Sequence, residues 1–328
     1  MTPDIIGLLD KEWVFTAPEE IGRASIRRFA QAIWDANPLY HDATYAGESK
    51  YEGIIAPPTM VCETLQYMAG GLNEAGGNDR RPVLLLGGEI RGGNEYTLFQ
   101  PMRPEDILTV RWRAADVTEK EGRSGKLVFL VSQIVYTNQH GTTLAVNRET
   151  TIYRVSGSPE DRSEAPITRT WEAAGVSARR AGRPDGPLHF EDVEAGDEVP
   201  ALEKALSLPQ MVAYAAATWD FHRYHYDHEY ARQQGYPQPF ADGQMLGAFL
   251  AQMLADWMGD PGAIHKIGFR FRDLVFPGDV LSCKGRVTAK SSQRDRNLVE
   301  CELWIENQDG KLVLSPAHAS ILLPSRGI

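Results

Sequence analysis

The chain has 328 residues, of which 42% are hydrophobic and 24% charged, a composition typical of a globular protein with room for two domains. Its formal net charge is −10, and no cluster of Lys and Arg is dense enough to follow a phosphate backbone, which argues against nucleic acid as a partner. The three cysteines, Cys62, Cys283 and Cys301, form no CxxC pair, so neither a disulfide framework nor a zinc site is indicated.

The N-terminal residues, MTPDIIGLLDKEWVF, carry charges on both sides of a short apolar run and lack the basic region of a signal peptide. No later segment approaches the ~20 apolar residues of a membrane span. We therefore expect an unprocessed cytoplasmic protein without a membrane segment, and a reducing compartment also fits the scattered cysteines.

The first half reads as helices followed by strands. An amphipathic helix over about 19–34 leads into a loop that carries Asp35, and a longer helix follows over about 59–73. Segments of near-alternating β-branched and aromatic residues, bounded by Gly, Asn and Pro, predict antiparallel strands. These segments cover 84–91, 95–99, 106–117, 127–138 and 143–155.

A polar stretch rich in Pro and Gly then separates the two halves. We place a first domain at 1–156, a linker at 157–186 and a second domain at 187–328. The second domain repeats the pattern of the first. Helices are expected over about 208–218 and 244–258, and strands over 267–276, 279–289, 297–307 and 311–323.

The chain contains an internal repeat. FAQAIWDANPLYHDATYA (29–46) aligns with YAAATWDFHRYHYDHEYA (214–231) at a constant offset of 185, which places Asp35 on Asp220. Further on, Pro104 aligns with Pro277 at an offset of 173, so the first half holds about twelve extra residues, which we place in the Gly- and Asn-rich stretch 70–82. The repeat predicts a tandem α+β fold. In each unit one long helix is wrapped by a curved antiparallel sheet, and the two units form an internal pseudo-dimer.

The segment Asp220-Phe-His-Arg-Tyr-His225 places a carboxylate and an imidazole five positions apart on a loop. Such a pair can hold one water molecule, take a proton from it as it attacks C3 of an enoyl thioester, and deliver a proton to C2. Negative charge then grows on the thioester oxygen. Gly243, at the start of the helix over 244–258, offers a backbone N–H and the helix dipole to stabilise that charge.

These residues resemble the hydratase 2 motif of MaoC-like dehydratases, a Gly-Asp-x-Asn-Pro-(Ile/Leu)-His run followed later by Ala-His-Gly. Similarity extends to 190–199 and 269–279, and the first half resembles the N-terminal dehydratase-like half of the same tandem proteins through NPLYHD (37–42), IIAPPT (54–59) and RPEDILTV (103–110). The resemblance implies two hot-dog domains, an acyl-CoA or acyl-carrier-protein thioester as substrate, no metal or redox cofactor, R stereochemistry, and pairing of two tandem chains into a homodimer. It places Asp220 and His225 on the catalytic positions and Gly243 on the oxyanion-hole glycine.

This sequence departs from the motif at three points. Trp219 stands where Gly is usual, His222-Arg223 replaces Asn-Pro, and Asp242 stands where His is usual. These changes leave the acid, the base and the glycine in place, so they bear on the identity of the acyl group, which the motif does not specify.

The first half lacks the complete set of a carboxylate, an imidazole and a backbone N–H at the start of a helix. At the offset of 185, His225 falls on Tyr40 and Gly243 falls on Pro58, which has no N–H to donate. Asp35 is retained and His41 lies one residue late. We expect one active site per chain, in the second half, with the first half closing the acyl pocket.

Other residues carry two interpretations. His222 enriches the cluster near the active loop, where several histidines could indicate a metal, but their spacing matches no zinc motif. Arg270 and Arg272 lie on one strand face. They either bind the pantetheine or nucleotide phosphates of the substrate or belong to a solvated strand face. His222, Arg270 and Arg272 are therefore candidate substrate-binding residues.

Two other functions compete with hydration of an enoyl thioester and the reverse dehydration, which would most often belong to fatty acid metabolism. Hot-dog proteins include thioesterases, which attack the carbonyl carbon and release a thiol. A non-catalytic acyl-CoA-binding or assembly subunit is the third reading, but a binder has no use for an acid, a base and an oxyanion donor together.

Overall fold

The structure is a computed structural model that describes residues 11–79, 89–122, 125–154, 186–260, 262–293 and 296–326, together with Gly7 and Leu9. The predicted linker, apart from its last residue, lies outside these residues, as do residues 84–88 of the predicted strand over 84–91.

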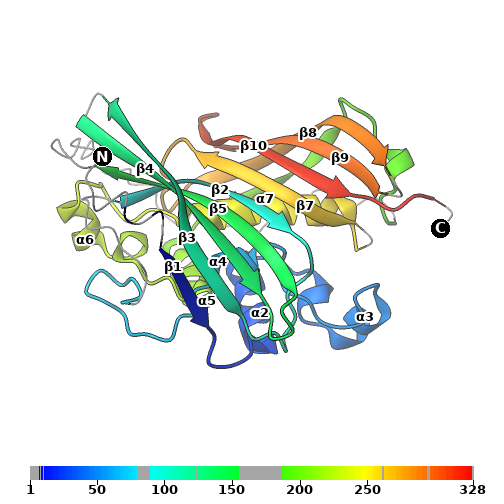
Figure 1. Ribbon diagram of the computed structural model, residues 1–328. Coiled ribbons are helices and arrows are strands. Elements are labelled where there is room, and N and C mark those ends of the chain that lie inside the picture. The colour runs from blue at the N-terminus through cyan, green and yellow to red at the C-terminus, as the bar shows by residue number, and fades with distance from the viewer. Residues whose placement is uncertain are drawn as a thin grey trace.

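Ten strands form one antiparallel sheet in the order β1-β3-β4-β5-β2-β7-β10-β9-β8-β6 (Figure 1). The first five strands are β1 (Glu12–Thr16), β2 (Glu89–Leu98), β3 (Thr109–Gly122), β4 (Gly125–Thr137) and β5 (Thr143–Arg154). The other five are β6 (Glu198–Ala205), β7 (Ala263–Phe271), β8 (Val280–Gln293), β9 (Arg296–Asn307) and β10 (Leu312–Leu322). Each half therefore contributes five strands in the same internal order, and the two sets meet at β2 and β7.

The pairing of β2 with β7 lies on the internal pseudo-twofold axis. Glu95 of β2 pairs with Gly268 of β7. Their separation, 268 − 95 = 173, equals the offset between Pro104 and Pro277, so these two residues are equivalent positions of the repeat that face each other. The tandem α+β architecture and the internal pseudo-dimer are thus confirmed.

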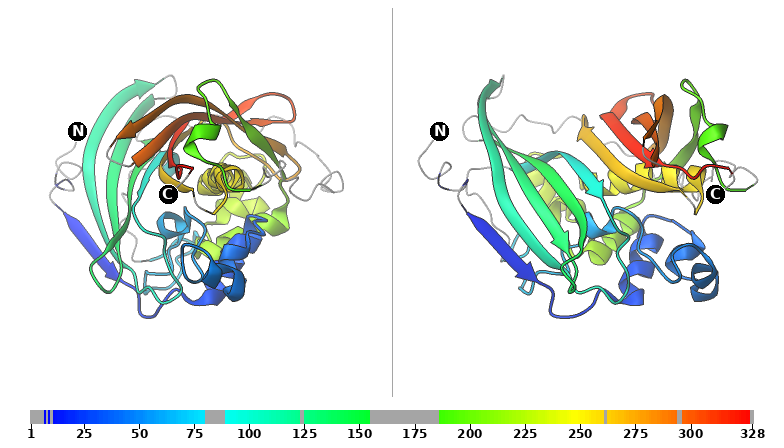
Figure 2. Two further views of the ribbon diagram at one scale, coloured as in Figure 1. Left: turned by 90° about the vertical axis from the view of Figure 1, so that its right-hand side faces the viewer. Right: turned by 45° about the vertical axis from the view of Figure 1, so that its right-hand side comes forward.

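The sheet curves around one long helix, α7 (Gly243–Met258). Seen nearly along this helix, the strands form an arch over it, and shorter helices lie on the open side (Figure 2). Apart from Gly243, Ala255 and Asp256, every residue of α7 is buried. A helix that is apolar around most of its circumference requires cover on all sides, and here the sheet and the first-half helices provide it.

The remaining helices are short. They are α2 (Gly22–Ala32), α3 (Ala43–Glu48), α4 (Met60–Glu63), α5 (Leu208–Thr218) and α6 (His228–Gln233), with 3₁₀ turns η1 (Pro38–Tyr40), η3 (Phe190–Asp192) and η4 (Arg223–His225). The predicted helices over 19–34, 208–218 and 244–258 are confirmed as α2, α5 and α7. None of the helices in the described part of the chain has the length and apolar character needed to cross a bilayer.

The helix predicted over 59–73 is wrong, because α4 ends after Glu63. Beyond it the backbone turns away to satisfy the C-terminal carbonyls of α5. The Leu65 amide donates to the Thr218 carbonyl (2.7 Å), and the Gln66 side chain donates to the Ala217 carbonyl (2.7 Å). The apolar spacing after Glu63 thus reflects packing of an irregular segment, and residues 58–73, which are equivalent to α7 in the repeat, do not form a long helix.

Two edge strands, β1 and β6, were not predicted. Both are short, and β6 contains the fully buried Lys204, whose charge interrupts the apolar pattern of a strand. The segments over 84–91 and 95–99 were expected to be two separate strands. Within the described residues 89–98 they form the single strand β2.

Side chains of the second half cap the C-terminus of α2 in the first half. The Lys204 ammonium donates to the Ile33 carbonyl (2.6 Å) and to the Gln252 side-chain oxygen (2.6 Å). The Gln210 amide donates to the Ala32 carbonyl (2.8 Å). The last carbonyls of a helix have no partner within it and carry its negative dipole end, so a buried cation there both satisfies and stabilises them.

Replacing Lys204 with Met should therefore destabilise the chain by about 2–4 kcal/mol, because two buried acceptors lose their donor. Urea unfolding curves measure this change. Arg286→Met, which removes an exposed ion pair with Glu302, is the matched control and should cost less than about 1 kcal/mol. Equal losses in the two variants would contradict the capping role.

Candidate active site

A pocket of about 130 Å³ opens where α7 begins, and both halves of the chain line it. Four of the six predicted site residues, Asp220, His222, His225 and Gly243, belong to this lining. The other lining residues are Glu89, Ile90, Arg91, Tyr224, Phe240, Ala241, Asp242, Leu246, Phe271, Asp273, Leu274 and Val275. The repeat thus folds so that strand β2 of the first half closes the pocket of the second.

The C-terminus of α5 positions Asp220. Trp219 adopts a left-handed conformation (φ 63°), and the Asp220 amide then donates back to the Ala215 carbonyl (3.0 Å). This is the Schellman arrangement, in which a left-handed residue usually is Gly, and it explains why Gly is usual at this point of the motif. Trp34 has the same conformation (φ 52°) in the first half, so both halves accept this backbone strain.

His225 lies in the 3₁₀ turn η4, and its ring is held by the backbone. Its Nδ1 lies 2.9 Å from the carbonyl oxygen of Phe240. Since a carbonyl only accepts hydrogen bonds, Nδ1 carries the proton, and in the neutral ring Nε2 is left as the acceptor. The Phe240 ring also packs edge-on against the imidazole, with centroids 5.8 Å apart.

Gly243 begins α7, so its amide has no acceptor within the helix. A Cβ at this position would lie 2.5 Å from the Phe271 ring, which packs directly over the glycine. Asp242 caps the helix by accepting from the Gln244 amide (3.0 Å). Gly243 and Phe271 both line the pocket, and only glycine leaves room for the Phe271 ring at the start of the helix.

Arg91 was missed by the sequence analysis. From β2 its Nη1 donates to Asp242 (2.9 Å) and its Nε to Glu149 (3.1 Å), and its side chain is 18% exposed. Burial alone would lower the pKa of Arg91, but these two partners and the Asp220 carboxylate hold it well above its ordinary value. The charged residue within strand β2 was the available signal, but only the fold shows that it reaches the other half's pocket.

Arg270 and Arg272 do not line the pocket. They alternate along the exposed face of β7 and the residues that follow it, as predicted, and the Arg272 Nε donates to the Ser315 carbonyl (2.6 Å). Within the described residues, no three or more His, Cys, Asp or Glu side chains gather in a way that would hold a metal ion.

Comparison with known proteins agrees with this architecture. A model of the FAS1-like dehydratase domain region matches residues 12–146, and a model of the MaoC-like domain matches residues 192–307. Together they cover most of both halves. The chain belongs to the MaoC-like dehydratase family of double hot-dog proteins.

Individual relatives are distant. A UPF0336 protein of Thermobifida fusca is 32% identical over 39% of this chain and 81% of its own length. One from Streptomyces coelicolor is 37% identical over 31% of this chain, and the chain spans just under two thirds (66%) of that relative. Mesaconyl-C(4)-CoA hydratase of Chloroflexus aurantiacus is 26% identical over 58% of this chain and 55% of its own.

Two solved structures share the fold along nearly the whole chain. A MaoC-like dehydratase superposes with a TM-score of 0.72 at 21% identity, covering 95% of this chain and 97% of its own. A conserved hypothetical protein of Mycobacterium tuberculosis, described as a double hot-dog fold, gives a TM-score of 0.66 at 12% identity and covers 96% of each chain.

In this MaoC-like chain the insertion of the first half supports the Asp220–His225 loop. Residues 71–79, within the stretch where the extra residues were expected, lie against that loop, and the Arg223 amide donates to the Ala75 carbonyl (2.8 Å). Gly76 has a φ of 82°, and a Cβ there would lie 1.7 Å from the Phe221 carbonyl oxygen. Only glycine fits this close approach.

A Gly76→Ala substitution should therefore push residues 220–226 away from the insertion. We expect the Arg223 amide to exchange with deuterium at least about tenfold faster, because its hydrogen bond opens more often. Hydrogen exchange read by mass spectrometry measures this. Gly47→Ala, whose added Cβ meets nothing within 4 Å, is the control. Unchanged protection in the Gly76 variant would show that the insertion does not hold the loop.

A buried carboxyl group lies next to this MaoC-like pocket. Glu63 is 1% exposed and accepts a hydrogen bond from the Tyr214 hydroxyl (2.7 Å). Burial raises the pKa of Glu63 to about 8; the Asp242 carboxylate adds to this rise, while the hydrogen bonds and Arg91 oppose it. At neutral pH the folded chain therefore holds Glu63 mainly in its neutral form.

This proton makes stability depend on pH. Between the ordinary value of 4.5 and about 8, the folded state binds a proton that the unfolded state has lost. Raising the pH through this window thus lowers the unfolding free energy by up to about 1.4 kcal/mol per pH unit. Glu63→Gln keeps an acceptor for Tyr214 and removes the titration.

The Glu63→Gln variant should gain stability relative to the native chain as pH rises through that window, and the gain should level off above it. Urea unfolding at a series of pH values measures the difference. The exposed Glu48→Gln serves as control. A difference that does not change with pH would mean that Glu63 ionises normally.

Proposed function

We propose that the chain is a hydratase or dehydratase that adds water to, or removes it from, the α,β bond of an acyl thioester. The observation that carries this proposal is that Asp220, His225 and Gly243, the three groups the reaction needs, line one pocket. The relationship to MaoC-like proteins and the similarity to a mesaconyl-C(4)-CoA hydratase support the same reaction class.

In the hydration direction the Asp220–His225 pair holds one water. The His225 Nδ1–H is held by the Phe240 carbonyl, so Nε2 is the nitrogen that exchanges protons with this water. The water oxygen adds to C3 while the pair takes up its proton, and a proton from the pair passes to C2. The pair returns to its starting state, so the net change is the addition of water.

The enolate-like intermediate carries negative charge on the thioester oxygen. We assign its stabilisation to the Gly243 amide at the positive end of α7. Loss of one such donor typically costs about 3 kcal/mol of transition-state stabilisation. Arg91 acts behind this site: it pairs with the capping Asp242 and attracts the Asp220 carboxylate, and so holds both groups in place.

The acyl group is proposed to be short or polar, because the pocket is small and its lining includes Arg91, Glu89 and Asp273. Comparison of kcat/KM for crotonyl-CoA and for trans-2-decenoyl-CoA tests this point. We further propose that the working form is a cytoplasmic pair of tandem chains, with His222 on the thioester side of the pocket and Arg270 and Arg272 as candidate contacts to substrate phosphates.

Asp220→Asn or His225→Ala should lower kcat at least about a hundredfold, because each removes half of the proton-transfer pair. Both changes should alter the unfolding free energy by less than about 1–2 kcal/mol. Loss of the enoyl absorbance of crotonyl-CoA measures turnover. His41→Ala, an exposed histidine of the first half, is the control and should keep most activity.

Three results would contradict the proposal in different ways. An inactive His41 variant beside an active His225 variant would move the chemistry to the first half. Release of free thiol without loss of the double bond would indicate a thioesterase, whereas acyl-CoA binding without turnover of any enoyl-CoA would indicate a binding subunit.

A further inference from the structure

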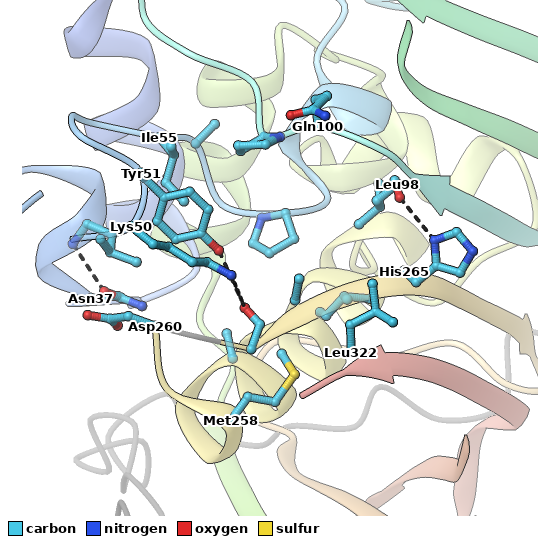
Figure 3. Close-up of a pocket in the computed structure, with 18 of the residues that line it drawn as sticks. Asn37, Lys50, Tyr51, Ile55, Leu98, Gln100, Met258, Asp260, His265 and Leu322 are labelled. Atoms are coloured by element: carbon cyan, nitrogen blue, oxygen red, sulfur yellow. Dashed lines mark hydrogen bonds between the residues drawn. The ribbon is translucent and has the colours of Figure 1, made fainter. Parts of the chain in front are cut away.

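The first half contains a second and larger pocket, of about 380 Å³. We call it the first-half pocket, and side chains of both halves line it (Figure 3). Ile55 and Leu98 enter from the first half, and Met258 and Leu322 from the second. Small-molecule sites typically measure about 300–1,000 Å³ and have mostly apolar linings with a few polar groups, a description that fits this pocket.

This pocket is the pseudo-symmetric counterpart of the candidate active site. Adding the offset of 185 to its lining residues Asn37 and Tyr40 gives His222 and His225 of the active-site pocket. Adding 173 to Leu98 likewise gives a lining residue, Phe271. Two pockets of the same ancestry are therefore present, and only one of them retains the imidazole.

The ionic cluster of the active site is replaced by apolar residues here. Arg91 corresponds to Ile264, since 264 − 91 = 173, and Ile264 lines the first-half pocket. Asp242 corresponds to Pro57, since 242 − 185 = 57, and Pro57 is buried. Without these charges the interior favours a hydrocarbon chain, because burying apolar surface is favourable and no charge has to be desolvated.

Polar groups gather at one side of the pocket. The Lys50 ammonium (3.3 Å) and the Tyr51 hydroxyl (3.4 Å) both donate to the Gly262 carbonyl, and Lys50 is an exposed residue (Figure 3). The charged lining residues are the cations Lys50 and Arg296 and the carboxylate Asp260, whose charge acts on Lys50. Counted over the whole lining, the formal balance is one positive charge, and Lys50 is the cation beside the Gly262 carbonyl at the rim.

We propose that the first-half pocket binds a fatty acyl ligand without hydrating it, with the hydrocarbon chain inside and an anionic head group at the Lys50 rim. Tyr40 and Pro58 stand where a hydratase needs an imidazole and a donor amide, so bound ligand is not turned over. The proposal rests on the repeat and on this lining, and it holds whether or not the other pocket is a hydratase.

The repeat offers matched variants to test it. Ala263 lines the first-half pocket and Ile90, at the equivalent position (263 − 90 = 173), lines the active-site pocket. Decanoate binding is measured by calorimetry on the full chain. Ala263→Trp should weaken it at least about tenfold, whereas Ile90→Trp should leave it within about twofold. Crotonyl-CoA turnover should show the reverse pattern.

A second variant isolates the head group. Lys50→Met should weaken decanoate about tenfold and leave the neutral decanol unchanged, because only the carboxylate uses the cation. Lys50 is exposed, so this variant remains informative even if Ala263→Trp does not fold. Binding of decanoyl-CoA to the Ile90→Trp chain identifies the source of the ligand: a tighter complex than with decanoate indicates a thioester, and a weaker one indicates a free fatty acid.

Several results would overturn the proposal. These are failure of the native chain to bind either ligand, loss of binding only in the Ile90 variant, or equal effects of Lys50→Met on decanoate and decanol. None of them depends on hydratase activity, because both ligands are saturated and binding itself is measured.

Discussion

The hydrogen-bonded pairing of β2 with β7 is the interaction on which the rest of the molecule depends. It joins two five-stranded sheets at their edges, which removes two open edges that would otherwise invite aggregation. It also lies on the pseudo-twofold axis, so each half delivers the start of one strand to the other half's pocket. Strand β2 thus brings Arg91 into the second-half pocket, and β7 brings Ile264 into the first-half pocket.

The repeat places two pockets at equivalent positions, and they differ in charge: one is ionic and the other is mostly apolar. One pocket retains an acid, an imidazole and a glycine at a helix start, and it gathers further charge through Arg91 and Glu149. The first half keeps the carboxylate as Asp35 but has Tyr40, Pro58 and Ile264 in place of the imidazole, the glycine and Arg91, and its pocket is roomier and more apolar. A buried ionic cluster is stable only when each charge has partners, so such clusters tend to be either complete or absent.

Much of this could be predicted from the sequence because the repeat is strong and local patterns are clear. Asp220, His222, His225 and Gly243 were identified from the loop motif, the helix start and the resemblance to MaoC-like dehydratases, and they lie around one pocket. Helices α2, α5 and α7 begin and end near the expected residues. The features that were not predicted depend on contacts between residues far apart in the sequence. Arg91 reaches a carboxylate 151 residues away, and the predicted helix after Met60 stops at Glu63 because the following amides serve the end of α5. Neither contact leaves a periodic trace in the sequence.

The end of α4 at Glu63, where the second half has the long helix α7, affects both the end of α5 and the Asp220–His225 loop. A complete helix after Glu63 would occupy the chain that now caps α5 and continues into the insertion at residues 71–79. Both segments support the same loop, since α5 ends at Thr218, just before it, and the insertion contacts Phe221 and Arg223. In the first half, the residues equivalent to α7 do not form a long helix, and this part of the chain instead supports both the end of α5 and the Asp220–His225 loop. Rigid support of this kind is what proton transfer between a loop carboxylate, an imidazole and a single water requires, because small displacements of these groups cost large factors in rate.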